Sequence, residues 1–325
     1  MQKSDLKIVF MGTPEFAVAT LKTLVENNYN VVAVVTQPDK PVGRHGSTLQ
    51  PSAVKQYAQS VGLPVLQPEK MKDAAFVEQL RSYGANLQVV VAFRMLPEVV
   101  WAMPAYGTFN VHASLLPQYR GAAPINWAVI NGETRTGVTT FFLDHEIDTG
   151  RMIEQATFDI PADADVEYVY DGLMRLGAEV CLSTLDIIVA ADGRPATTAQ
   201  ADVADGQLKP APKLFKDTCQ IDWRQEARRV YNFVRGLSPS PGAWTTVCDG
   251  NGYETVLKLY RTSLSGLPAG ENEPGRLVVD KKHLYIACAD ELLCVDELQL
   301  AGKKRMETQA FLNGQKGLEA CVCKF

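Results

Sequence analysis

Residues 7–36 read KIVFMGTPEFAVATLKTLVENNYNVVAVVT, and this stretch decides the fold class. Apolar runs at 7–11 and 31–36 predict two buried strands, because a strand covered on both faces shows no polar alternation. Between them apolar residues recur with a helical period, with Thr13 as the expected N-cap and Pro14 at the first helical position. A strand, a helix and a second strand in this order predict a parallel sheet with a right-handed crossover.

Further segments extend this sheet along the chain. Strands are expected at 88–93, 108–112, 136–143 and 151–158, and helices at 52–61, 124–131 and 166–190. The segment 37–48 carries Pro, Gly and charged residues without a period, which indicates a surface loop. Residues 1–192 are therefore expected to form an α/β domain around a doubly wound, mostly parallel sheet.

A second domain is expected after a change in composition. Residues 193–209 are interpreted as a linker, within a stretch rich in Ala, Pro, Asp and Lys. A helix is expected at 223–237, with Arg224, Arg228 and Arg235 facing outward. Short strands separated by Gly, Pro and Asp follow at 243–247, 255–260, 275–279, 284–287 and 292–300. Residues 210–325 are therefore expected to form a small, OB-like β-barrel.

Composition excludes several classes of protein. The 325 residues are 46% apolar and 21% charged, as in a globular protein with two domains. No run of about 18 apolar residues predicts a membrane span, and the N-terminus lacks a secretory leader pattern. The 7 Cys form no CxxC pair, which argues against a disulfide framework or a zinc site. We therefore expect a cytoplasmic protein without a metal.

Charge is distributed unevenly along the chain. The net charge is −5, but residues 1–208 carry 15 Lys and Arg against 23 Asp and Glu, whereas residues 209–325 carry 17 against 14. The basic run Lys303, Lys304 and Arg305 lies in the second part. On a small barrel such residues are able to follow a phosphate backbone. Random variation between domains explains the uneven charge about as well, and each basic run taken alone is better explained as an ordinary solvated face.

Three polar residues suggest acyl-transfer chemistry. Asn110 and His112 are two apart at the end of an expected strand, so their side chains point to the same face. The amide of Asn110 is a donor for a developing oxyanion, His112 is able to exchange protons, and Asp148 is able to orient the imidazole. No Ser or Cys lies in a nucleophile elbow, so direct transfer between two bound substrates is favoured. Taken singly, Asn110 and His112 also fit an ordinary strand end, and Asp148 an ordinary Asp-Thr-Gly turn.

The turn after the first strand argues against nucleotide binding. Residues 12–15 read GTPE, without the GxGxxG pattern, and Glu15 would repel a phosphate at the helix start. A nucleotide-dependent oxidoreductase is therefore not expected. Arg44 lies between Gly43 and Gly46 in the expected surface loop, where it would either clamp an anionic substrate or remain a solvated charge.

Motifs along nearly the whole chain resemble those of the methionyl-tRNA formyltransferase family. In the first domain they are MGTPEF at 11–16, TQPDKPVGR at 36–44, NVHASLLP at 110–117, RGAAP at 120–124, GVT at 137–139 and DTG at 148–150. In the second domain they are IDW at 221–223, PGAW at 241–244 and AGKK at 301–304. The central motif is shared with a wider formyltransferase superfamily, and the C-terminal motifs narrow the resemblance to the tRNA enzymes.

The resemblance implies transfer of a formyl group from 10-formyltetrahydrofolate to the α-amine of methionyl initiator tRNA. It implies a Rossmann-like formyltransferase domain, with Asn110, His112 and Asp148 as the catalytic trio and Arg44 at the tRNA acceptor end. The folate-contacting segment would be Ser114, Leu115, Leu116 and Pro117. No protein partner is implied, so a monomer is expected.

Some residues depart from the family pattern, and other functions remain open. Phe93-Arg94-Met95 replaces a common Tyr-Gly-aliphatic run, and the loop after Arg44 is poor in lysine. A formyltransferase acting on a small amine, such as a purine-pathway ribonucleotide or an amino sugar, fits the central motif. A non-enzymatic RNA-binding protein on a degenerate transferase scaffold is a further alternative, which the intact trio disfavours.

Overall fold

The computed structural model describes residues 1–42, 48–201, 207–280, 282–314 and 317–325, and the chain forms two compact units. The first unit comprises Met1–Gly121, Arg135–Asp159 and Tyr170–Lys209, and the second comprises Ala122–Thr134, Ile160–Val169 and Pro210–Phe325. The chain therefore passes between the units several times. The domain limits expected at residues 192 and 209 remain a prediction.

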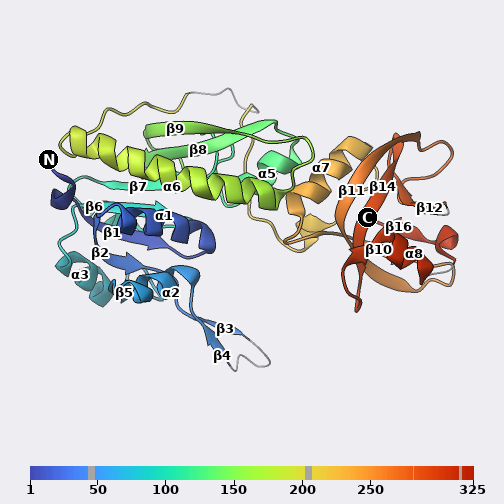
Figure 1. Cartoon of the computed structure of the whole chain (residues 1–325), viewed down its shortest axis with the longest axis horizontal. Coiled ribbons are helices and arrows are strands. Elements are labelled where there is room, and N and C mark those ends of the chain that lie inside the picture. Colours follow the sequence, from blue (N-terminus) through green and yellow to red (C-terminus); the bar gives the residue numbers. More distant parts are fainter. Residues whose placement is uncertain (43–47, 202–206, 281, 315–316) are drawn as a thin grey trace. The chain divides into compact units, whose positions relative to one another are not determined.

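A seven-stranded sheet forms the centre of the first unit (Figure 1). Its order is β5 (Val65–Leu66), β2 (Asn30–Val35), β1 (Lys7–Gly12), β6 (Leu87–Val91), β7 (Thr108–His112), β8 (Arg135–Phe142) and β9 (Met152–Asp159). The first five strands are parallel, and β8 and β9 pair in antiparallel fashion. The predicted doubly wound, mostly parallel sheet is confirmed.

Helices cover both faces of this sheet. They are α1 (Glu15–Glu26), α2 (Ala53–Ser60), α3 (Ala74–Ser82), α4 (Glu98–Trp101) and α6 (Val166–Ala190). Val9 and Met11 lie in an apolar core with residues of α3 and α4, whereas Gly12 and Val111 lie against α1 and α6 on the other face. This alternation follows from the two-residue period of a strand. Helix α3 was not predicted from the sequence.

Two local predictions were wrong. Helix α1 begins at Glu15 with Pro14 as its N-cap, and the buried hydroxyl of Thr13 has no hydrogen-bond partner in the described structure. Pro14 is extended, with a φ of −80° and a ψ of 175°, so it precedes the helix instead of starting it. The segment 37–48, expected as a surface loop, includes β3 (Lys40–Val42), which pairs in antiparallel fashion with β4 (Thr48–Gln50), and its residues 43–47 lie outside the described ranges.

The order of the strands defines where a ligand is expected. From β1 the chain proceeds outward to β2 and β5, then returns to β6 and β7 on the other side of β1. The direction of winding therefore reverses between β1 and β6. In open α/β sheets, ligands bind beyond the carboxyl ends of the strands at such a reversal. Because β1, β6 and β7 are parallel, Gly12, Val91 and His112 end their strands at this same edge.

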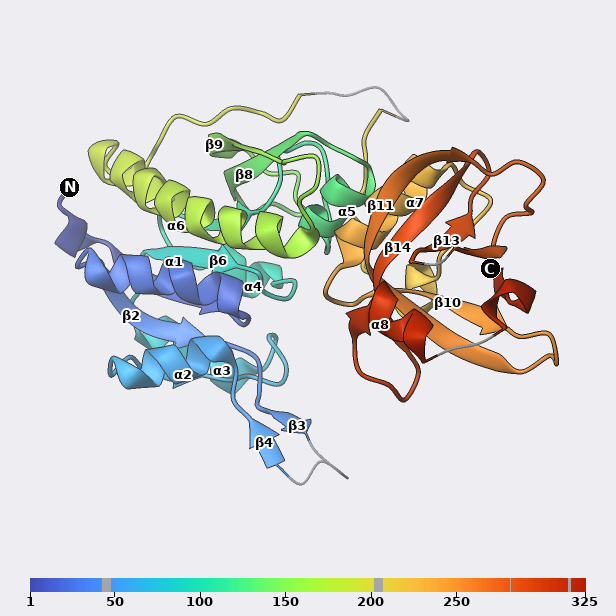
Figure 2. The same ribbon diagram turned by 45° about the vertical axis from the view of Figure 1, so that its right-hand side comes forward.

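The second unit is built around an antiparallel sheet with the order β12 (Leu277–Val279), β13 (Leu284–Ala287), β14 (Glu291–Leu300), β11 (Glu254–Pro268), β10 (Ala243–Cys248) and β16 (Val322–Lys324), with β15 (Met306–Glu307) paired to β14. Figure 2 shows β11 and β14 side by side. A bridge between Arg276 and Val322 joins the two ends of the sheet. The predicted small barrel is therefore confirmed as a nearly closed one.

Helices α5 (Pro124–Ile130), α7 (Ala227–Leu237) and α8 (Thr308–Asn313) belong to this unit, with short 3₁₀ helices at Asp217–Cys219 and Leu318–Ala320. A further 3₁₀ helix, Lys3–Asp5, lies in the first unit.

Arg235 of α7, expected to face outward, is only 8% exposed. Its Nη1 donates to the carbonyl oxygen of Ala164 at 2.8 Å and its Nε to Asn232 Oδ1 at 2.9 Å. Burial lowers the pKa of the Arg235 guanidinium below its ordinary value. Partners on a distant segment make this burial possible.

No helix among the described residues is long and apolar enough to cross a bilayer.

Candidate active site

The site begins with two side chains on β7. Asn110 pairs with Val90 of β6, and Val90 pairs with Met11 of β1, so these three residues share the face covered by α3 and α4. His112 lies two residues further on and shares that face. His112 is 6% exposed, and Asn110 is half-buried. The prediction that both side chains lie at one strand end is confirmed.

The imidazole of His112 is fixed by three neighbours. Nε2 lies 2.9 Å from the carbonyl oxygen of Tyr119, and the ring meets Phe141 edge-on at 6.3 Å between centroids. Because a carbonyl oxygen only accepts hydrogen bonds, Nε2 carries a proton. Nδ1 therefore faces the third neighbour, Asp148, whose Oδ2 is 3.9 Å away. That separation is an ion-pair distance, too long for a direct hydrogen bond.

Asp148 lies in the turn between β8 and β9. Its backbone has a φ of 56°, a left-handed conformation that costs on the order of 1 kcal/mol or more for a residue with a side chain. The backbone N–H of Gly121 donates to Asp148 Oδ2 at 2.9 Å. Gly150 permits the turn, because a Cβ there would clash with the carbonyl oxygen of Phe142. The turn thus holds the carboxylate beside His112.

Asn110 supplies a polar side chain whose hydrogen-bonding groups are available. Its carboxamide forms no side-chain hydrogen bond with any residue that the structure describes. A half-buried amide of this kind keeps two N–H donors and an acceptor for a bound molecule. The three residues predicted as catalytic therefore combine an available amide, a fixed imidazole and a carboxylate.

The segment Ser114–Pro117 follows β7 directly and is held by its own hydrogen bonds. The hydroxyl of Ser114 donates to the carbonyl oxygen of Gln118 at 2.7 Å, and Ser114 is fully buried. Thr139 of β8 donates to the Ser114 carbonyl at 2.7 Å and accepts from the Leu116 N–H at 3.2 Å. A folate contact by Ser114 would therefore use its backbone. The folate role of Ser114, Leu115, Leu116 and Pro117 stays a prediction.

Arg94 is tied to the loop that precedes α3. Its guanidinium donates to the carbonyl oxygens of Pro68 and Glu69, the latter at 2.9 Å. Burial lowers the pKa of this guanidinium below its ordinary value. Arg94 thus braces the segment after β6 against residues 68–69. No sequence pattern indicates these backbone partners.

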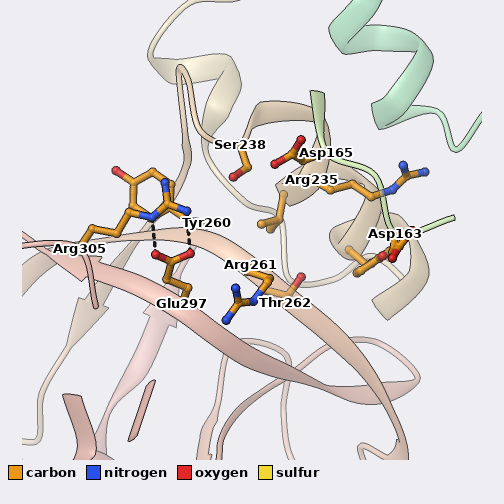
Figure 3. A pocket seen from close by; sticks show the side chains of 11 residues that line it. Asp163, Asp165, Arg235, Ser238, Tyr260, Arg261, Thr262, Glu297 and Arg305 are labelled. Carbon is orange, nitrogen blue, oxygen red and sulfur yellow. Dashed lines mark hydrogen bonds and ion pairs between the residues drawn. The ribbon is translucent and has the colours of Figure 1, made fainter. Parts of the chain in front are cut away.

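Of the residues expected to contact tRNA, Lys303, Lys304 and Arg305 lie in the second unit. Arg44 lies outside the described residues. Lys303 and Lys304 are exposed on the turn after β14. Arg305 donates to both carboxylate oxygens of Glu297 at 2.6 Å and lies 4.3 Å from the Tyr260 ring centre, as Figure 3 shows. This pair lowers the pKa of the Glu297 carboxyl below its ordinary value.

The pocket in Figure 3, of about 150 Å³, includes Arg305, Glu297, Tyr260 and Arg235 in its lining. Gln299 anchors the same turn by donating to the Lys303 carbonyl oxygen at 2.9 Å. Arg305 therefore secures the turn, while both lysine side chains remain exposed.

The cysteine thiols and the possible metal ligands among the described residues do not favour thiol or metal chemistry. Burial raises the pKa of Cys288 and of Cys323 to about 12, and it also raises the pKa of Cys181. Such thiols are poor nucleophiles at neutral pH. Across the described ranges, no group of three or more His, Cys, Asp or Glu side chains is arranged to hold a metal ion.

Comparisons with known proteins agree with this geometry. The family model described as Formyl transferase matches residues 6–185, and that of the Formyl transferase C-terminal domain matches residues 213–316. The chain is thus an enzyme of the formyl transferase family.

Its full-length relatives narrow the assignment. The chain is 59% identical to a methionyl-tRNA formyltransferase from Parabacteroides distasonis over 97% of its own length and 98% of the relative's. It is 55% identical to one from Bacteroides thetaiotaomicron, over 97% of both chains. The chain belongs to the methionyl-tRNA formyltransferase family.

A solved structure supports the fold alone. WlaRD, a sugar 3N-formyl transferase crystallised with dTDP and 5-N-formyl-THF, superimposes with a TM-score of 0.64 at 17% identity. The match covers 92% of this chain and 99% of that one.

Proposed function

We propose that this enzyme transfers the formyl group of 10-formyltetrahydrofolate to the α-amino group of methionyl initiator tRNA, with Asn110, His112 and Asp148 as its catalytic residues. The observation that carries the assignment of residues is the 3.9 Å contact between His112 Nδ1 and Asp148 Oδ2. The available amide of Asn110 lies on the same face of the sheet as His112. The folate supplies the formyl group when bound.

Each of the three residues has a separate role in formyl transfer. The amine attacks the formyl carbon, and the carbonyl oxygen becomes negative as the new C–N bond forms. The Asn110 amide donates to this oxygen, a contact of a kind worth roughly 10²- to 10³-fold in rate. Because Nε2 of His112 donates to Tyr119, only Nδ1 is available to share a proton with Asp148 and the developing oxyanion. Asp148 orients the imidazole and assists removal of the amine proton. The negative oxygen then re-forms its carbonyl as the bond between the formyl carbon and the folate nitrogen breaks, and that nitrogen takes up a proton as tetrahydrofolate leaves.

The activity is tested with purified protein, 10-formyltetrahydrofolate and charged initiator tRNA. We expect N-formylmethionine after the aminoacyl bond is cleaved, and far less product from charged elongator tRNA. Formylation of an amino sugar or of a ribonucleotide amine, with none on the tRNA, would instead favour a small-amine enzyme.

The tRNA interface is part of the same proposal. Lys303 and Lys304 contact the phosphate backbone, with Arg305 at the base of the turn, and Arg44 engages the acceptor end on the strength of the family resemblance. We also propose that the protein acts as a monomer in the cytoplasm, since no protein partner is required by this chemistry.

Replacing Lys303 and Lys304 together by Ala should weaken tRNA use. Each lost phosphate contact should lower the slope of log affinity against log salt by about 1, and the KM for tRNA should rise on the order of 10-fold at low salt. The KM for the folate should stay unchanged. Kinetics at several salt concentrations measure both effects.

The matched control for this double variant is Lys3→Ala with Lys22→Ala. It removes the same charge from exposed positions of the first unit. An equal rise in the KM for tRNA in both double variants would show that net charge, and not the turn at 303–305, sets the affinity.

A further inference from the structure

The side chain of Gln200 lies at the centre of a hydrogen-bond network around the Asp148 turn. Its Nε2 donates to the carbonyl oxygen of Asp148 at 2.8 Å and to that of Gly150 at 2.9 Å. Its Oε1 accepts from Nε and Nη2 of Arg120, at 3.1 and 2.6 Å. The Gln200 amide thus joins the backbone at residues 148 and 150 of the turn to Arg120, which lies on the segment that follows β7.

The Arg120 contact fixes which way round this amide lies. A guanidinium only donates hydrogen bonds, so the Gln200 oxygen must face Arg120. The Gln200 nitrogen then faces the two carbonyl oxygens, which only accept. All four hydrogen bonds are therefore mutually consistent.

Backbone pairing brings Gln200 to this position. Thr198 and Met152 exchange two backbone hydrogen bonds, of 2.8 and 2.9 Å, at the start of β9. Arg151 Nε donates to the Thr197 hydroxyl at 2.7 Å. The segment 197–200 is therefore held beside the start of β9, next to the turn, although its composition is that of a linker.

We propose that Gln200 is a positioning residue for formyl transfer, acting through Asp148 with Arg120 as its support. This inference depends on the catalytic role proposed for Asp148. The turn contains a residue in a left-handed conformation, so its geometry persists only where its surroundings determine it. Without the Gln200 amide, the carbonyl oxygens of Asp148 and Gly150 lose their shared donor. The turn then relaxes, and the carboxylate loses its placement beside His112.

The test compares Gln200→Ala with Thr197→Val in the full-length enzyme. A misplacement of about 1 Å costs up to about 100-fold in rate, so we expect kcat of Gln200→Ala to fall about 10- to 100-fold. Both KM values should change less than about 3-fold, because neither substrate contacts Gln200 in this proposal. Thr197→Val removes one hydrogen bond from the same segment but leaves the bonds of Gln200 to the Asp148 and Gly150 carbonyl oxygens in place, and it should keep normal kcat.

A double-mutant cycle separates positioning from general destabilisation. In an Asp148→Asn background, Gln200→Ala should cost less than about 3-fold further, because its effect passes through a carboxylate that is already absent. Fully additive losses, or unchanged kcat in Gln200→Ala, would overturn the inference. Absence of formyl transfer by the unaltered enzyme would instead overturn the proposed function.

Discussion

Replacing His112 by Ala should lower kcat for formyl transfer by about 10³-fold, since it removes a group that serves both proton transfer and the developing oxyanion. The loss should be in kcat, with small changes in both KM values, because the imidazole lies on the sheet face and is 6% exposed. Single-turnover kinetics with saturating folate and tRNA measure the chemical step directly.

Folding must be separated from catalysis for this variant. A buried imidazole replaced by Ala leaves a cavity, at a cost of about 2 to 4 kcal/mol. His112→Gln fills more of the space and keeps an N–H donor for the Tyr119 carbonyl, so it should be better folded but similarly inactive. His145→Ala, at an exposed position of the β8–β9 turn, is the matched control and should keep full activity. Turnover of His112→Gln within 10-fold of normal would remove His112 from the mechanism.

Local patterns predicted the elements that carry the site. Strand 108–112 and helix 166–190 were predicted with the bounds that the structure has. Both depend on short-range signals: an apolar strand with two polar residues on one face, and a long helical period. The placement of Asn110 and His112 on one face therefore followed from the sequence alone.

The contact between His112 and Asp148 was not predictable from a local pattern of this kind. The residues are 36 positions apart, and their approach depends on Gly121, Gly150 and a left-handed residue in the turn. None of these features has a period that a sequence pattern reveals. The chemistry of the residues suggested that Asp148 is able to orient His112, but only the family resemblance placed the two side chains in one site.

Side chains with long-range partners were the least predictable. Gln200 lies in a segment whose composition indicates a linker, so no role was predicted for it. The spacing of Arg235 along α7 predicted that it faces outward. Each is held by backbone carbonyls on distant segments: those of Asp148 and Gly150 for Gln200, and that of Ala164 for Arg235. Burial of an amide or a guanidinium becomes favourable only when such acceptors are in place, and these partners emerge only with the tertiary structure.

Replacing Asp148 by Asn should lower kcat by about 10²- to 10³-fold while leaving the fold intact. The amide oxygen of Asn is able to accept the hydrogen bond from the Gly121 N–H, so the turn keeps its main anchor. What disappears is the negative charge 3.9 Å from His112 Nδ1 and the acceptor for the amine proton. Kinetics with both substrates, beside thermal unfolding, measure the two consequences separately.

Asp144→Asn is the control for this substitution, because Asp144 is exposed in the same turn and undergoes the same change of charge. Its kcat should be normal. If both variants lost activity equally, the negative potential of the whole turn would matter more than the contact with His112. If Asp148→Asn alone is impaired, the carboxylate acts through its position, and Gln200, which donates to the Asp148 carbonyl oxygen at 2.8 Å, maintains that position.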